Sequence, residues 1–115
     1  MRQDVQDLIT AMQAGWKKVP AMSEWYFEDR HGHWRGHFQD ITEIRAACAQ
    51  GHALLGKNAL GIGDWLSLFP ILKSQRVLFK DGTTTDLGDA INRLVMDAYW
   101  TTPQVIEWLR SHLND

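Results

Sequence analysis

The hydrophobic pattern of this chain changes period at Pro20, and this change constrains the fold more than any other feature. Before the proline, apolar residues recur at helical spacing, which predicts a helix over residues 4–19. They are Val5, Leu8, Ile9, Met12 and Trp16. After the proline, residues 24–38 are rich in aromatic side chains and alternate in polarity, which is typical of strands. A chain with both patterns is predicted to be α+β.

Residues 24–38 are predicted to form a β-hairpin with His31-Gly32 as a two-residue turn, because glycine accepts positive φ. In this register one face is mostly apolar and carries Trp25, Phe27, Trp34 and Phe38. The other face pairs Tyr26 with His37, Glu28 with Arg35, and Arg30 with His33. We therefore expect the apolar face of the hairpin to pack on the core and the ionisable face to lie in solvent.

The remainder of the chain predicts more helices and a second hairpin. Asp40 caps a predicted helix that runs to Leu55, and Asp64 caps a short helix that ends at Pro70. Asp81-Gly82 is a turn signal between two short strand patterns, and helices follow from about residue 86 and from Thr102. We expect a single α+β domain over residues 1–115, with about five helical segments and one or two antiparallel β-hairpins. The strands are expected to form a single compact layer of sheet covered by helices.

Length and composition exclude several classes of protein. A chain of 115 residues buries roughly two-thirds of its surface on folding, which suffices for one modest hydrophobic core without a disulfide or a structural metal. The net charge of −2 provides no basic excess for duplex DNA, and no apolar run approaches the length that spans a bilayer. The single cysteine, Cys48, forms no internal disulfide and no cysteine-built zinc site. We therefore expect a cytoplasmic protein that does not contact the membrane.

The residue clusters that resemble catalytic sites are incomplete. His31, His33 and His37 lie close in sequence, but in a strand His33 and His37 would be about 13 Å apart, too far to share a metal. Cys48 and His52 have helical i,i+4 spacing, yet Cys48 falls on the predicted inner stripe, and we expect His52 at the surface. The sequence thus predicts a protein that is not an enzyme and that has no cofactor and no metal.

The abundance of aromatic residues favours a binding function. Tyrosine, tryptophan and arginine are enriched at interface hot spots, and six tryptophans exceed what a core of this size usually buries. We expect a small binding protein of the inhibitor, immunity or phage-modulator type, which docks a protein partner through Tyr26, Glu28, Arg30, His33, Trp34, Arg35 and His37. Three alternatives stay open: single-stranded nucleic-acid binding by the hairpin, a metal-dependent enzyme built on the histidines, and a homodimer formed through the aromatic face.

Overall fold

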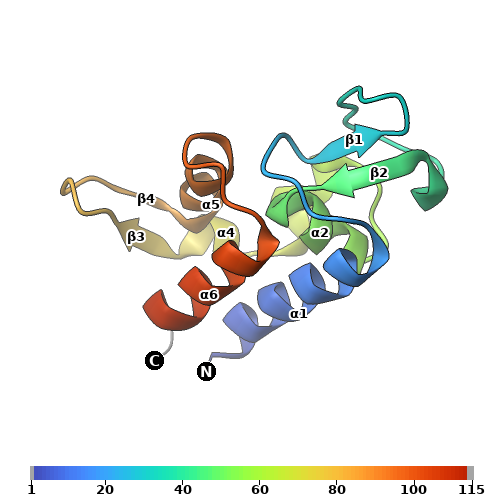
Figure 1. Ribbon diagram of the computed structural model, residues 1–115. Coiled ribbons are helices and arrows are strands. Elements are labelled where there is room, and N and C mark those ends of the chain that lie inside the picture. Colours follow the sequence, from blue (N-terminus) through green and yellow to red (C-terminus); the bar gives the residue numbers. More distant parts are fainter. Residues whose placement is uncertain (1, 114–115) are drawn as a thin grey trace.

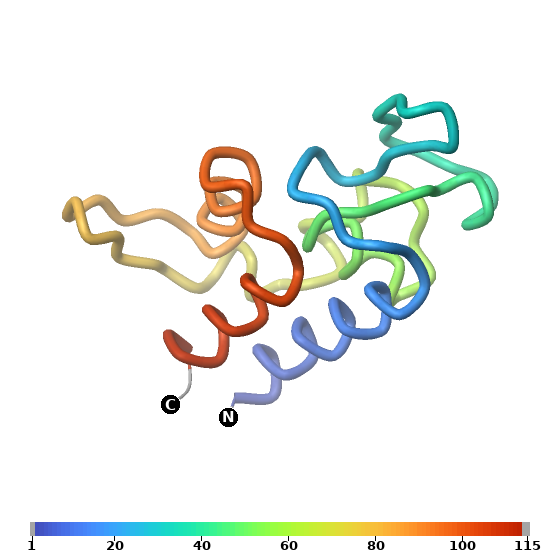
Figure 2. The backbone as a smooth tube through the Cα atoms, in the orientation of Figure 1, coloured from blue at the N-terminus to red at the C-terminus, as the bar shows by residue number. Residues whose placement is uncertain are grey.

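The computed structural model describes residues 2–113 and confirms the α+β class (Figure 1). Its helices are α1 (Gln3–Lys18), α2 (Ala49–Gly56), α3 (Trp65–Leu68), α4 (Ile71–Ser74), α5 (Leu87–Met96) and α6 (Thr102–His112). Its strands are β1 (Phe27–Asp29), β2 (Ile44–Ala47), β3 (Arg76–Leu78) and β4 (Thr84–Asp86). In place of the expected single layer, the strands form two separate antiparallel pairs, β1–β2 and β3–β4, at opposite ends of the molecule (Figures 1 and 2).

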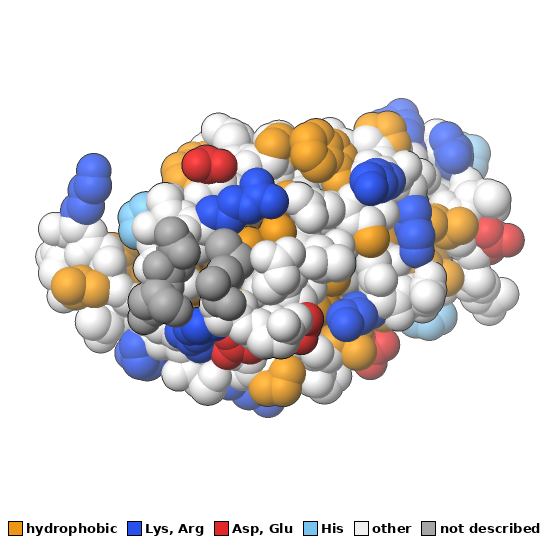
Figure 3. Space-filling view, turned by 90° about the horizontal axis from the view of Figure 1, so that it is seen from below, with side chains coloured by type: hydrophobic (Ala, Val, Ile, Leu, Met, Phe, Trp, Pro, Cys, Tyr) orange, Lys and Arg blue, Asp and Glu red, His pale blue; other side chains and the backbone are white. Residues whose placement is uncertain are grey.

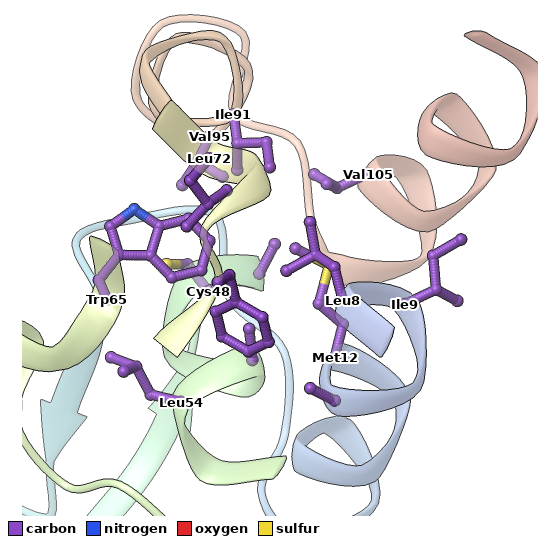
Figure 4. Close-up of a cluster of buried hydrophobic side chains, with 14 of the residues drawn as sticks. Leu8, Ile9, Met12, Cys48, Leu54, Trp65, Leu72, Ile91, Val95 and Val105 are labelled. Atoms are coloured by element: carbon purple, nitrogen blue, oxygen red, sulfur yellow. The ribbon is translucent and has the colours of Figure 1, made fainter. Parts of the chain in front are cut away.

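The core lies between α1, α2 and the C-terminal helices. The predicted stripe of α1 is buried at Val5, Leu8, Ile9 and Met12, whereas Trp16, one turn from the helix end, is 42% exposed. Figure 4 shows Leu8, Ile9 and Met12 in one cluster with side chains from α2, α4, α5 and α6, among them Leu54, Leu72, Ile91 and Val105. Each buried aliphatic side chain of this kind contributes roughly 1.5–3 kcal/mol to folding. The core therefore joins segments from both ends of the chain.

Helices α1 and α2 approach so closely that their backbones touch, and glycine makes this possible on both sides. A Cβ atom at Gly15 of α1 would lie 1.8 Å from the carbonyl oxygen of His52 in α2. A Cβ atom at Gly56 of α2 would lie 2.0 Å from the carbonyl oxygen of Ala11 in α1. Because no side chain fits at either point, the two glycines set the distance between the helices.

Residues 24–38 depart from the predicted hairpin. Strand β1 pairs with β2, with Phe27 opposite Ala47, and it meets the following segment at a bridge between Glu28 and Trp34. The turn has three residues instead of two. The Asp29 N–H donates to the His33 carbonyl at 2.8 Å, and the Gly32 N–H, at a residue with φ +82°, donates to the Asp29 carbonyl at 3.1 Å. The extra residue shifts the register by one, so that Trp34 lies opposite Glu28 instead of Asp29 and is exposed, whereas Phe27 and Phe38 stay buried as predicted.

The predicted helix from Asp40 to Leu55 is wrong in its first half. The Asp40 carboxylate accepts the Thr42 N–H at 2.9 Å, but it caps only one 3₁₀ turn, Ile41–Glu43. The chain then extends as β2 and becomes helical again at Ala49. Pairing with β1 and burial of Ile44 and Ala47 favour the strand over the local helical pattern.

The C-terminal half follows the sequence pattern more closely. The β3–β4 hairpin places Arg76 opposite Asp86 and turns at Asp81-Gly82, as predicted. Asp86 caps α5 by accepting the Asp89 N–H at 2.8 Å. Helix α5 ends at Met96, earlier than expected, and α6 is capped by Thr101 instead of Thr102. The short helix α4 was not among the predicted segments.

We predict that Gly15→Ala destabilises the protein by about 3 kcal/mol, because the new methyl group forces α1 and α2 apart. Urea unfolding followed by tryptophan fluorescence measures this change. Gly63→Ala is the matched control, because a Cβ atom there meets nothing within 4 Å. We expect the control to change the free energy of unfolding by less than about 1 kcal/mol. Equal unfolding midpoints for the two variants would show that the helix contact does not limit stability.

Candidate functional site

The three-residue turn after β1 is organised by a buried carboxylate. Asp29 is 6% exposed, and its Oδ1 accepts the backbone N–H groups of His31 and His33, each at 2.9 Å. These bonds, led by the one from His33, hold the pKa of the Asp29 carboxyl below its usual value. The imidazoles of His31 and His33 stand exposed on this loop. The loop is thus tied down by its backbone while its side chains stay available.

The charged residues of the predicted face are held by contacts within the protein. Glu28 pairs with Arg45 at 2.8 Å, and Arg35 pairs with Glu43 at 3.4 Å. The Arg35 guanidinium also lies 4.4 Å from the centre of the buried Phe38 ring, and Arg30 Nε donates to the Thr42 carbonyl at 2.9 Å. These contacts connect the loop to the segment that leads into β2. Both arginines of the predicted site therefore already have partners.

The three histidines of this region do not form a metal site. His31, His33 and His37 are all exposed, and His37 pairs instead with Gly61 in an isolated bridge. Among residues 2–113, no group of three or more His, Cys, Asp or Glu side chains is placed to hold one ion.

Tyr26 does not share a surface with the other predicted site residues. Its φ of +26° turns the side chain inward, where its ring makes edge contacts with Trp25 at 5.5 Å and with Trp65 at 6.5 Å. Gln50 Nε2 donates to the Tyr26 hydroxyl at 3.2 Å. Burial raises the pKa of this phenol to about 12, and nearby Cys48 adds to the shift, so the phenol stays neutral near pH 7. Tyr26 lines a polar pocket of about 530 Å³ with Gln50, Trp65 and Asn92.

A second pocket gathers exposed aromatic side chains from two distant parts of the chain. We call it the aromatic pocket; it is lined by Ser23, Glu24, Trp25, Trp34, Met96 and Tyr99 and has a volume of about 600 Å³. Trp34 is 54% exposed and Tyr99 is 67% exposed. In Figures 1 and 2 the segment after α1 runs beside the turn after α5. By sequence, residues 23–25 belong to the first segment and Tyr99 to the second, whereas Trp34 follows β1. Of the predicted site residues, only Trp34 lines this pocket.

Sequence reasoning missed Met96 and Tyr99 as members of a site. Tyr99 has φ +58°, a left-handed conformation that favours glycine and costs other residues about 1–2 kcal/mol. The Trp100 N–H donates to the Leu94 carbonyl at 3.0 Å, which closes the end of α5 around this residue. The left-handed conformation of this aromatic residue can be recognised only once the end of α5 is known. The proximity of Met96 to Trp25 is a tertiary contact with no local signal.

Cys48 and His52 are buried and serve the packing of the fold. The Cys48 thiol is completely buried, which raises its pKa to about 11, so the reactive thiolate is suppressed near neutral pH. His52, expected at the surface, is also completely buried. Its Nε2 donates to the Val19 carbonyl at 3.0 Å, so its unprotonated Nδ1 accepts from the Thr102 hydroxyl. Both ring nitrogens are occupied, and the histidine does not activate the cysteine.

Comparisons of the chain with known protein families, curated proteins and solved structures give no match. No helix among residues 2–113 is both long enough and apolar enough to cross a membrane.

We predict that the buried His52 makes the protein less stable as the pH falls below neutrality. Burial lowers the pKa of His52 from 6.5 to about 4, so the unfolded chain binds the proton first and stability falls between these values. From pH 7 to pH 5 the loss is about 2 kcal/mol, above the range in which aspartate carboxyls protonate. Urea unfolding at several pH values measures it. His52→Gln should remove this slope and His31→Asn should keep it; an unchanged slope in His52→Gln refutes the assignment.

Proposed function

We propose that this protein is a small, non-enzymatic binding protein that docks a protein partner at the aromatic pocket. The observation that carries the proposal is the exposure of Trp34 and Tyr99 around a shared hollow of about 600 Å³. Large aromatic rings at the rim of a pocket are typical interface anchors, because they bury much area and lose little side-chain freedom. The proposal keeps Trp34 from the sequence prediction and adds Trp25, Met96 and Tyr99.

The pocket is built to hold its shape before a partner arrives. The Trp25 ring packs edge-on against Tyr26, and the Trp25 Cη2 atom lies 3.4 Å from the position of a Cβ on Gly36. Tyr99 is fixed by the closed end of α5 in a conformation that its residue type disfavours. Strained, well-positioned groups reduce the entropy cost of association, and such strain is concentrated at functional positions.

The buried groups with nucleophilic or proton-carrying chemistry support a binding role. The pKa of Tyr26 is about 12 and that of Cys48 about 11, so neither ionises near pH 7. His52 is neutral and enclosed. A cytoplasmic inhibitor, an immunity protein or a modulator of a host factor would act in this way, and the size of the chain is typical of these classes.

Single-stranded nucleic acid is the second candidate, because Trp34 and the exposed histidines are sequence-tolerant stacking groups. The engagement of Arg30 and Arg35 in internal contacts disfavours it, because phosphate contacts provide most of such affinity. Figure 3 shows the face that carries α1 and α6, where Lys and Arg side chains are scattered among acidic and uncharged groups.

We predict that a photo-reactive benzoylphenylalanine at position 34 cross-links one discrete protein in the cells that make this chain. The same group at position 16, which also replaces an exposed tryptophan, is the matched control and should give no such product. Tyr99→Gly should abolish the product from position 34, because it removes one wall of the aromatic pocket. Identical products from both positions, a nuclease-sensitive product or a dimer of this chain would each overturn the proposal.

We also predict that Tyr99→Gly does not destabilise the protein. The substitution relieves the left-handed backbone at φ +58° and removes a side chain that is mostly in water. The free energy of unfolding should stay within about 1 kcal/mol of the original value. Phe27→Ala, which empties a completely buried site, should cost about 3–4 kcal/mol in the same measurement. A loss for Tyr99→Gly as large as that of Phe27→Ala would mark Tyr99 as a packing residue.

A further inference from the structure

We propose that the aromatic pocket receives an organic cation, namely a lysine or arginine side chain, methylated or not, that the partner protein presents. This inference rests on the proposed function and names the chemistry of the group that enters the pocket. It follows from which side chains line the pocket, which charges surround it and which basic residues are absent from its wall.

The rings that line the pocket are suited to a cation. Trp25, Trp34 and Tyr99 line one hollow from separate segments of the chain, and the thioether of Met96 completes the apolar wall. The face of an aromatic ring carries partial negative charge and attracts an ammonium or guanidinium group, and tryptophan does so most strongly. Groups of such rings around one hollow are the arrangement by which quaternary ammonium and methylated lysine are recognised.

The charges at the pocket have one sign. Glu24 is the one charged residue in its lining, and Asp97 directly follows Met96 in the chain. Both are exposed, and within residues 2–113 neither takes part in an ion pair. Arg35, which follows Trp34, is held by Glu43 and by the Phe38 ring. The pocket lining therefore offers one carboxylate, three aromatic rings and no basic side chain.

An apolar occupant would use only part of this chemistry. It would gain from burial against the rings, but it would draw the Glu24 carboxylate away from water without giving it a partner. A cation with an aliphatic stem gains both the ring contacts and the charge complementarity. The volume of about 600 Å³ accommodates a bulky head group such as trimethylammonium.

The test compares choline with 3,3-dimethylbutan-1-ol, in which a carbon atom replaces the charged nitrogen. Binding is followed by the indole N–H signals of the tryptophans in ¹H–¹⁵N spectra of the full chain. We expect choline to shift the Trp25 and Trp34 signals and to bind about five- to tenfold more tightly than its neutral analogue. N-acetyl amides of lysine, trimethyllysine and arginine are then ranked in the same way, which identifies the form of the cation.

Two variants separate the contributions of ring and charge. Tyr99→Leu keeps an apolar wall and Glu24→Gln keeps a polar side chain, so each should weaken choline about threefold and leave the neutral analogue unchanged. Trp16→Leu, at an exposed tryptophan outside the pocket, should change neither affinity. Because Tyr99 and Glu24 are exposed, neither substitution threatens the fold.

The outcomes separate this inference from the proposed function. Equal binding of choline and its neutral analogue, or no binding of either, refutes the proposed cation site. The docking of a protein partner is then decided by the cross-linking experiment alone. Preferential binding of choline together with a failed cross-link from position 34 retains the cation site and overturns the protein partner. A preference for choline that neither Tyr99→Leu nor Glu24→Gln reduces places the cation elsewhere and refutes the inference.

Discussion

The burial of the neutral His52 imidazole between three segments of the chain is the constraint on which the rest of the structure depends. One ring nitrogen binds the carbonyl of Val19, directly after α1, and the other binds Thr102, the first residue of α6. The backbone carbonyl of the same residue lies under Gly15. A side chain in α2 thus connects the end of α1 to the start of α6. Both ends of the chain are organised around the central helix because a buried imidazole needs both partners.

Much of the fold could be predicted from local pattern, and the failures have a common cause. The stripe of α1, the Asp81-Gly82 hairpin and the cap of α5 depend on residues within one or two turns of each other, so spacing alone identifies them. The segment after Asp40 has a helical pattern but forms β2. It does so because Ala47 pairs with Phe27, which lies 20 positions earlier in the chain and leaves no local signal. The turn after β1 is one residue longer than predicted, because the buried Asp29 closes a three-residue loop.

The sequence predicted which types of residue form the candidate site better than it predicted where they lie. An excess of tryptophan and tyrosine indicated exposed rings, and Trp34 is one of them. The positive φ of Tyr26 and the contact of its ring with Trp65 separate it from Arg30 and Arg35. Met96 and Tyr99 lie more than 60 positions from Trp34, and no local signal joins such residues. Proteins place strain at a few positions, and these are where local rules fail.

The same histidine also positions the walls of the aromatic pocket, although it contacts neither. Glu24 and Trp25 follow Val19 by a few residues, and Tyr99 precedes Thr102 by three residues. The two walls are therefore short extensions of the segments that His52 holds. Strand β2 also holds the first of these segments, because the Ala47 N–H donates to the Pro20 carbonyl and the Met22 N–H donates to the Ala47 carbonyl, each at 3.0 Å. The wall that contains Trp25 is therefore anchored by the buried ring on one side and by the backbone of β2 on the other.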